Sequence, residues 1–546
     1  MPSFATKRAP SSEKLRGGYY TPGPIAEFLA DWVSVDGGRL LEPGCGDGSI
    51  LKALGTRGEV VGIELDETEA LKAQTAVPSA CVLQRDFFEW FTPEQRGAWN
   101  GVVGNPPFIR FQHWTEPTRG RAFEIMRGES LRPTKLTNAW VPFVVAGALA
   151  LRDGGRLGLV VPAELMQVTY AAQLRAFLVD AFSEITVISF RQLVFEGILQ
   201  EVVLLLGVRG QGPARIKVVE QEDASSMPVA NGLGSRPHAP ALRQDSEKWT
   251  KYFLEPSQIG ALRVVREKGG LRRLGDLAEV DVGIVTGRNR FFVMRPSAGA
   301  TRDVEAHLVP LVSKSAHLRG TRFASPDLSA LEGDDALCRL LAVEEKTALE
   351  GDHALRSYVL AGEAEQVHEG YKCSIRRSWW VVPSVWVPDA FLLRQIHDHP
   401  RIIANEAGAT STDTIHRVRR LNGVRTSGLA AASVNSATFA FAEVLGRSYG
   451  GGVLELEPTE AEALPFPDPS ALNERSAKQV DRLVRAGRVL DAADLVDRVL
   501  LIEHHGLSPD LVTELRSAWQ RLRDRRLRRG RRKNSAQEAF ELAPAA

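Results

Sequence analysis

Cysteine is scarce in this chain. Four cysteines (Cys45, Cys81, Cys338 and Cys373) are spread over 546 residues, and no two of them form a C-x-x-C pair. A fold stapled by disulfides, or one built around a zinc ribbon, needs closely spaced cysteines. The sequence therefore disfavours both classes and fits a reducing compartment, so we expect a cytoplasmic protein.

Long apolar runs are also missing. No run reaches the roughly 18 residues that a membrane helix requires, and residues 1–18 contain no apolar signal core. We therefore expect neither a membrane partner nor secretion.

The chain as a whole lacks a charge excess, since 68 Lys and Arg residues against 67 Asp and Glu residues give +1. The charge is nevertheless unevenly spread. Residues 516–533 carry ten basic residues and one acidic residue, whereas residues 1–515 carry 58 basic and 64 acidic residues. Ten like charges repel one another unless a polyanion neutralises them. We expect this basic block to contact DNA or RNA, and the alternative is a solvated helix end.

The first 210 residues alternate between two kinds of segment. Strand-like apolar runs lie at 38–44, 58–66, 80–88, 100–108, 155–165, 184–190 and 201–208, and helix-like stretches lie at 24–33, 67–76 and 170–182. This alternation is typical of an α/β domain with a mostly parallel sheet. We expect the last two runs to form an antiparallel edge.

The alternation stops near residue 211, where Pro, Gly and Ser become frequent. The later part mixes short strands with turns and ends in helical stretches, which indicates a mixed α+β domain. The predicted regions are an N-terminal arm (1–16), a first domain (17–210), a strand and linker (211–240), a second domain (241–470), a helical basic region (471–533) and a disordered tail (534–546).

A glycine-rich loop, LEPGCGDG at 41–48, follows the first strand-like run and contains Glu42. Glycines let the backbone turn sharply and approach a ligand closely. Glu64 ends the next run, where a carboxylate binds ribose hydroxyls, and Asp86-Phe87 ends the third, where a carboxylate beside an aromatic ring suits adenine. This combination favours S-adenosylmethionine over NAD. The alternative is a glycine-rich turn with solvated acids.

The tetrapeptide Asn105-Pro106-Pro107-Phe108 follows the fourth run. The Asn105 side-chain oxygen and the Pro106 carbonyl make two acceptors at fixed spacing, which can hold an NH2 group on a flat ring. Accepting both protons pushes that nitrogen towards a tetrahedral form, whose lone pair can attack a methylsulfonium. Phe108 would stack on the ring, so we predict that these four residues are catalytic. The alternative is a Pro-Pro turn with a core Phe.

The order GGYYTPGPIAEFL, LEPGCGDG, IELD, RDFF and NPPF resembles the gamma-type N6-adenine DNA methyltransferases of the TaqI-like kind, over about residues 17–210. The resemblance implies a Rossmann-like, S-adenosylmethionine-dependent methyltransferase domain followed by a C-terminal mixed α+β target-recognition domain. It implies site-specific methyl transfer to N6 of an adenine in double-stranded DNA, as the modification part of a restriction–modification or phage-defence system. The expected partner besides DNA is a separately encoded restriction endonuclease, and we expect a monomer.

The resemblance also implies roles for individual residues. The cofactor would be bound by Tyr20 and Thr21 at its methionine end, by Glu42 and Gly44 at its amino-acid moiety, by Glu64 at its ribose, by Asp86 and Phe87 at its adenine, and by Phe143 facing it. Gly46 of the glycine-rich loop is a further predicted cofactor-binding residue. A stacked adenine is out of reach, so the target base must be flipped out of the duplex. Phe195 matches the aromatic that would sandwich the flipped base against Phe108. The family more often has Tyr where this chain has Phe108, and a phenyl ring stacks equally well.

Residues 277–294, 371–391 and 405–420 resemble, more loosely, target-recognition segments. Arginine suits both phosphates and guanine edges. The predicted DNA contacts are Arg288, Arg290, Arg376, Arg377, Arg417, Arg419 and Arg420. The alternative for each is a solvated surface arginine.

Two other functions use part of the same pattern. N-P-P-aromatic motifs also serve rRNA guanine-N2 and protein glutamine-N5 methyltransferases, because both acceptors are planar NH2 groups. A non-catalytic DNA-binding defence subunit is the third hypothesis.

Asp335 with Glu344-Glu345-Lys346 mimics a nuclease pattern, but it lies inside an amphipathic stretch, so we do not expect DNA cleavage. His397, His399, His504 and His505 lack neighbouring carboxylates or cysteines that would complete a ligand set, so we do not expect a metal site.

Overall fold

The computed structural model describes residues 20–192, 194, 201–211, 214–227, 230, 239–240, 248–268, 270–344, 349–421, 423–449 and 452–541. The chain divides into two compact units, Met1–Phe253 and Leu254–Ala546. The predicted arm at 1–16 and the predicted stacking residue Phe195 lie outside the described residues.

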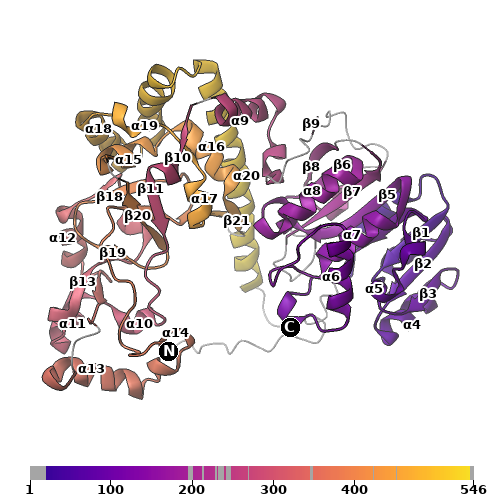
Figure 1. The fold of residues 1–546 in the computed structure, drawn as a ribbon, viewed down its shortest axis with the longest axis horizontal. Coiled ribbons are helices and arrows are strands. Elements are labelled where there is room, and N and C mark those ends of the chain that lie inside the picture. The colour runs from indigo at the N-terminus through magenta and orange to yellow at the C-terminus, as the bar shows by residue number, and fades with distance from the viewer. Residues whose placement is uncertain are drawn as a thin grey trace. The chain divides into compact units, whose positions relative to one another are not determined.

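A nine-stranded sheet forms the centre of the first unit (Figure 1). Its strand order is β3-β2-β1-β4-β5-β7-β6-β8-β9. The strands are β1 (Arg39–Pro43), β2 (Glu59–Glu64), β3 (Cys81–Gln84), β4 (Trp99–Gly104), β5 (Leu151–Pro162), β6 (Phe182–Phe190), β7 (Val202–Arg209), β8 (Arg215–Gln221) and β9 (Ala239–Pro240). All seven predicted runs are therefore strands.

The sheet is parallel from β3 to β5, and β7 runs antiparallel to both of its neighbours, β5 and β6. The expected antiparallel pairing of the last two runs is confirmed, although β7 lies inside the sheet and not at its edge. The sheet also continues past residue 210, because β8 pairs in parallel with β6. The region 211–240 thus begins with a strand of the first domain.

The helices of this unit are α2 (Gly23–Val33), α3 (Ser49–Leu54), α4 (Glu67–Ala76), α5 (Phe87–Trp90), α6 (Thr118–Gly128), α7 (Trp140–Ala150) and α8 (Ala172–Ala181). Helices α2 and α7 cover opposite faces of the sheet. A Cβ on Gly101 of β4 would meet Val33 of α2, whereas the next residue, Val102, lies against Gly147 of α7. Successive strand residues point to opposite faces, so the two helices enclose the sheet.

The second unit is built from several small sheets. Their strand orders are β11-β20-β16-β18-β14, β12-β15-β13-β19, β17-β22-β21 and β10-β23. The strands are β10 (Arg272–Arg273), β11 (Ala278–Asp281), β12 (Val293–Met294), β13 (Leu308–Val312), β14 (Arg322–Phe323), β15 (Arg339–Leu341), β16 (Ala390–Leu393), β17 (Gln395–Ile396), β18 (Ile402–Asn405), β19 (Thr410–Ser411), β20 (Ile415–Arg420), β21 (Arg447–Tyr449), β22 (Val453–Glu455) and β23 (Pro465–Phe466). The mixed α+β prediction for this region agrees with the structure.

Helices pack around these sheets. They are α9 (Pro256–Lys268), α10 (Asn289–Phe292), α11 (Pro296–Arg302), α12 (Ser325–Gly333), α13 (His353–Ala364), α14 (Tyr371–Ser374), α15 (Thr426–Ala432), α16 (Ser436–Leu445), α17 (Pro458–Glu462), α18 (Glu474–Arg485), α19 (Val489–Val496) and α20 (Pro509–Glu541). Among the described residues no single helix is long and apolar enough to cross a membrane. Helices α15 and α16 pass that test only as a pair bent by 73°.

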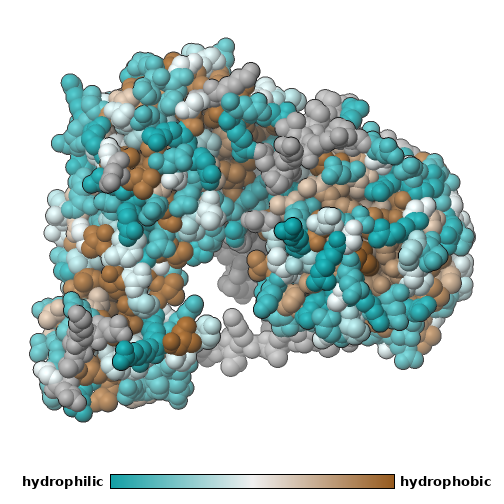
Figure 2. All heavy atoms as spheres, viewed as in Figure 1, coloured by the Kyte–Doolittle hydropathy of each residue, from teal (hydrophilic) through white to brown (hydrophobic). Residues whose placement is uncertain are grey.

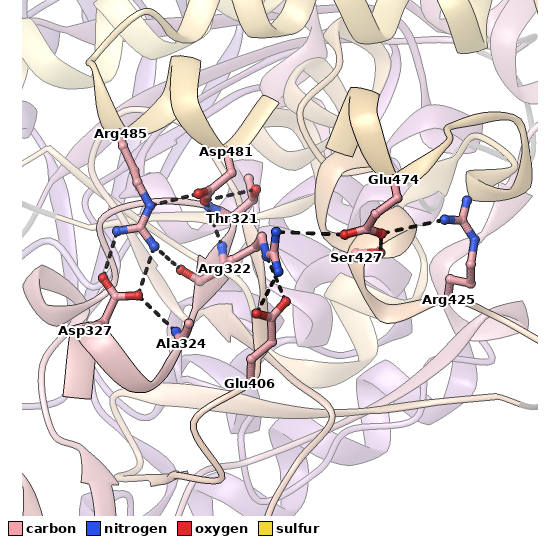
Figure 3. Close-up of polar contacts among 10 residues, drawn as sticks. All are labelled: Thr321, Arg322, Ala324, Asp327, Glu406, Arg425, Ser427, Glu474, Asp481 and Arg485. Carbon is pink, nitrogen blue, oxygen red and sulfur yellow. Dashed lines mark hydrogen bonds and ion pairs between the residues drawn. The ribbon is translucent and has the colours of Figure 1, made fainter. Parts of the chain in front are cut away.

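Hydrogen bonds and ion pairs connect helix α18 to strand β14 and helix α12 (Figure 3). Arg485 donates to both carboxylate oxygens of Asp327 at 2.8 and 3.0 Å and to the Arg322 carbonyl. Asp481, one turn earlier, accepts from the backbone N–H groups of Thr321 and Arg322. The helical region predicted at 471–533 is therefore an integral part of the second unit and not a separate module.

The basic block at 516–533, expected to contact DNA or RNA or to be a solvated helix end, is partly used inside the second unit. Arg516 pairs with Asp494 and Asp497, Arg523 pairs with Asp398, and Arg526 pairs with Glu443. The buried residues Leu515, Ala518, Trp519, Leu522 and Arg526 recur at helical spacing and fix one face of α20 in the unit. The predicted disordered tail is corrected as well, since α20 extends to Glu541, and residues 542–546 lie outside the described part.

Candidate active site

The motifs of the first unit meet at one edge of the sheet. Strands β1 and β4 are parallel neighbours, so the loop after Pro43 and the residues after Gly104 start side by side. A Cβ built on Gly44 would lie 3.7 Å from Phe143 Cε1 and 3.8 Å from Pro107 Cδ. The glycine loop, the NPPF motif and helix α7 therefore converge within contact distance.

Glycine is required in the loop for two reasons. Gly44, Gly46 and Gly48 have φ values of +72°, +54° and +83°, in the left-handed region that other residues seldom adopt. Gly48 also packs closely, because a Cβ there would lie 3.0 Å from Ala73 Cα. A Cβ on Gly46 would meet no atom within 4 Å, so its backbone faces open space.

A cavity of about 1350 Å3 opens at this edge. The predicted site residues that line it are Tyr20, Thr21, Glu42, Gly44, Gly46, Glu64, Asp86, Phe87, Asn105, Pro107 and Phe143. Two predicted residues do not line it: Pro106 is buried, and Phe108 packs against the core of the first unit. The predicted cofactor residues and Asn105 thus share one cavity.

Glu42 is the most unusual group in this cavity. Its side chain is 2% exposed, and its Oε2 atom has no hydrogen-bond partner in the described structure. Burial, with a smaller contribution from the Asp47 charge, raises the pKa of this carboxyl well above its usual range. An unpartnered carboxyl oxygen at a cavity wall is suited to a cationic donor.

Glu64 holds the loop in place. Its Oε2 accepts the Gly46 N–H at 2.9 Å, and its Oε1 accepts the Asp66 N–H at 2.9 Å. Each carboxylate oxygen retains a second lone pair for another donor. The side chain therefore both fixes the glycine loop and presents acceptor capacity to the cavity.

An aromatic wall lies beyond Glu64. Phe87 and Phe143 stack with ring centroids 5.3 Å apart and planes at 14°. Asp86, predicted at the end of the third strand, instead caps α5: its Oδ1 accepts the Phe88 N–H at 2.8 Å, and its Oδ2 accepts the Thr118 hydroxyl at 2.5 Å. The wall offers a stacked aromatic face with a carboxylate at its side.

The cavity also has a set of lining residues that the sequence analysis did not identify. They include Leu65, Phe88, Ile109, His113, Trp114, Thr118 and Ala139. Leu65, Phe88 and Ile109 directly follow predicted motif residues, so adjacency was an available signal. Nothing in the local sequence singled out His113, Trp114 or Thr118, which the β4–α6 connection and α6 bring to the site.

The seven predicted DNA-contact arginines in the second unit fall into three groups. Arg288, Arg290 and Arg377 are exposed, and the described residues offer their side chains no ion-pair partner. Arg419 and Arg420 are exposed and lie 3.5 Å from Glu279 and Asp389.

Arg376 and Arg417 form the third group and are used inside the unit. Arg376 donates to the Val285 and Thr286 carbonyls at 3.0 and 2.8 Å. Arg417 is 3% exposed and donates to the Val282 and Ser384 carbonyls. Their placement favours a role in shaping loops over direct DNA contact.

Asp335, the first residue of the nuclease-like pattern, is engaged inside the second unit. Asp335 accepts the backbone N–H of Ser297 at 3.0 Å and its hydroxyl at 2.7 Å, whereas Glu345 and Lys346 lie outside the described residues. Within the part of the chain that the structure covers, no cluster of three or more His, Cys, Asp or Glu side chains could hold a metal ion.

Comparison with known proteins decides the class of enzyme. Residues 62–195 match the family described as Eco57I restriction-modification methylase, and residues 246–501 match the C-terminal domain of the Type II methyltransferase M.Eco57I. The chain is a restriction–modification DNA methyltransferase. The predicted family resemblance and enzyme class are confirmed, and the second match begins close to the boundary between the two units.

Relatives cover nearly the whole methyltransferase. It is 21% identical over 505 residues to the Type II methyltransferase M.AccI of Acinetobacter calcoaceticus, covering 86% of this chain and 89% of that one. It is 23% identical over 467 residues to M.XamI of Xanthomonas campestris pv. amaranthicola, covering 83% and 85%. The Type IIL restriction-modification enzyme MmeI, solved in complex with DNA, has a TM-score of 0.57 at 12% identity over 94% of this chain and 75% of its own. This likeness supports the predicted fold.

Proposed function

We propose that this methyltransferase transfers a methyl group from S-adenosylmethionine to N6 of an adenine flipped out of duplex DNA, at a specific site. The observation that carries the proposal is the position of Asn105. This residue lines the same cavity as Glu42 and the glycine loop, directly after β4. Acceptor and cofactor can therefore meet in one enclosure, which is the positioning that methyl transfer needs.

The cavity fits the cofactor. The unpartnered Glu42 oxygen suits the ammonium of the methionine moiety, and Glu64 suits the ribose hydroxyls. The Phe87–Phe143 pair and Asp86 suit the adenine ring and its amino group. S-adenosylmethionine supplies an electrophilic methyl group, and the chain itself binds, orients and encloses the reactants.

The acceptor side depends on two oxygens at the end of β4. Asn105 lines the cavity, and its side-chain oxygen would accept one N6–H hydrogen bond and help leave the nitrogen lone pair free to attack. The Pro106 carbonyl, predicted to accept the other, belongs to a buried residue outside the cavity lining, and this second contact stays a prediction. An exocyclic amine without such acceptors keeps its lone pair delocalised into the ring. Stacking of the flipped base between Phe108 and Phe195 stays a prediction.

A cationic surface of the second unit supports DNA as the macromolecular substrate. We name the exposed cations Arg288, Arg290, Lys372 and Arg377 the α10–α14 surface. Gly287 has φ +82° and packs against Lys372, since a Cβ there would lie 2.9 Å from the Lys372 Cβ. In Figure 2, strongly hydrophilic and hydrophobic spheres lie together where these two helices reach the surface. Adjacent exposed cations with no ion-pair partner among the residues that the structure describes suit phosphate contacts.

We further propose that the enzyme acts as a monomer and protects host DNA from a separately encoded endonuclease. The family matches support this role, because they are restriction-modification methylase families.

The experiment that tests the proposal offers labelled S-adenosylmethionine to the full chain with duplex DNA, rRNA and total protein as separate acceptors. We expect label in DNA, and we expect it as N6-methyladenine after digestion to nucleosides. Methylome sequencing of an expressing host should then return one sequence motif. Label in rRNA guanine or protein glutamine, with none in DNA, would refute the proposal.

A further inference from the structure

The loop between α6 and α7 presents one leucine to solvent in a fixed backbone. Leu136 is 73% exposed, whereas Leu131, Thr137 and Ala139 are 6%, 4% and 1% exposed. The Thr134 hydroxyl accepts the Leu136 N–H at 3.2 Å, and the Thr137 hydroxyl accepts the Thr134 N–H at 2.8 Å. The side chain is therefore held outward by an ordered turn.

This turn borders the cavity of the candidate active site. The Ala139 N–H donates to the Ile109 carbonyl at 2.9 Å, and both residues line the cavity together with Asn105 and Pro107. Leu136 precedes Ala139 by three residues, so the turn that carries it leads directly into the cavity lining.

The rim around Leu136 is basic. Arg132 and Lys135 flank it within the loop, and Arg110 follows Ile109. All three are exposed, and their side chains have no ion-pair partner within the described part of the chain. This arrangement suits duplex DNA: the cations would contact the phosphate backbone, and the apolar side chain would insert between stacked base pairs.

We propose that Leu136 inserts into the duplex and occupies the space left by the extruded adenine. This inference rests on the proposed function. Extrusion exposes the faces of the neighbouring base pairs and leaves the partner base unpaired. An apolar side chain in the gap restores contact with those faces and prevents the adenine from returning, as intercalating wedges do in other DNA complexes. Leu136 is thus a positioning residue for the acceptor, distinct from the residues that touch the reacting atoms.

The test compares wild type and Leu136→Ala on two duplexes carrying the recognition sequence: one fully matched, and one with an abasic site opposite the target adenine. We expect Leu136→Ala to lower kcat/KM about tenfold or more on the matched duplex and less than about twofold on the abasic one, where extrusion needs no wedge. Fluorescence of 2-aminopurine at the target position should fall in the same variant, and Leu136→Phe should restore both readouts.

Leu71→Ala is the matched control, because Leu71 is 68% exposed in the same unit and does not line the cavity. It should behave as wild type on both duplexes. Equal kcat/KM for Leu136→Ala and wild type on the matched duplex would contradict the insertion of Leu136. An equal loss of kcat/KM on both duplexes would contradict it as well. If the wild type fails to methylate any DNA, the proposed function falls, and this inference falls with it.

Discussion

At the scale of single residues, the chemistry of the site depends on groups that are costly to bury alone. Burial raises the pKa of Glu42, and its Oε2 atom has no hydrogen-bond partner among the described residues. Below that raised pKa the folded protein keeps a proton that the unfolded chain loses at the usual carboxyl pKa. The protonated Glu42 carboxyl therefore contributes to the free energy of unfolding at acidic pH, and this contribution is lost as pH rises through the raised pKa.

Glu42→Gln should change stability and cofactor affinity in opposite directions. Without ligand, the variant should melt at a higher temperature than wild type above the raised pKa, because no buried carboxylate is left unpaired. Its affinity for S-adenosylmethionine should fall about 10- to 100-fold, since a charge-assisted hydrogen bond is worth about 1.5–3 kcal/mol.

Calorimetry in buffers of different ionisation enthalpy checks the same residue. Below the raised pKa, binding of S-adenosylmethionine to the wild-type protein should release a proton, because the cofactor ammonium favours the ionised Glu42 carboxylate. The affinity for S-adenosylmethionine should therefore weaken as pH falls. Glu42→Gln should release none. Equal proton release by both proteins would show that Glu42 does not face the ammonium.

At the scale of elements, the strands were predictable because each is a short apolar run bounded by turn residues. Helix α7 was not predicted, since all eleven of its residues are buried and a uniformly apolar segment carries no helical periodicity. The position of Asn105 directly after β4 followed from the sequence, whereas Trp114 and Thr118 depend on how α6 packs.

Helix α20 shows why a charge count misleads about an element. Arg526 and Glu443 are 3% and 4% exposed and lie 2.5 Å apart, so this arginine belongs to the core. Deleting residues 516–546, which a free basic tail would tolerate, would remove buried Trp519, Leu522 and Arg526. Such a truncation tests folding of the second unit and not DNA affinity.

Arg526→Ala should destabilise the second unit by about 3–5 kcal/mol, because it leaves the Glu443 carboxylate buried without a partner. Arg526→Met combined with Glu443→Leu should cost much less, since both charges are removed. Urea denaturation of the full chain measures both variants. Exposed Arg528→Ala is the control and should change stability by no more than about 0.5 kcal/mol; an equal loss from Arg528→Ala would contradict the assignment.

At the scale of the whole molecule, a net charge of +1 coexists with local cationic surfaces. The two-part organisation followed from the change in sequence pattern near residue 211, but its boundary did not. The structure places β8 in the first sheet and divides the chain after Phe253. Such a boundary depends on which distant segments pair as strands, and local sequence patterns do not contain that pairing.

The triple substitution Arg288→Ala, Arg290→Ala and Arg377→Ala should weaken DNA binding and reduce the slope of log K against log salt by about 0.9 for each phosphate contact removed. Cofactor binding should be unchanged. Fluorescence anisotropy across a salt series measures the slope. The control is Arg488→Ala, whose side chain is 62% exposed and paired with Asp491; a slope lowered equally by this control would show a non-specific charge effect.

The central claim is tested most directly by the N6-methyladenine content of duplex DNA after reaction with wild type and with Asn105→Ala. The account predicts N6-methyladenine from wild type and a loss of about 100- to 1000-fold in the variant, as for other contacts made only in a transition state, with DNA and cofactor affinity retained. Unchanged methylation by Asn105→Ala, or a wild-type product other than N6-methyladenine, would contradict it.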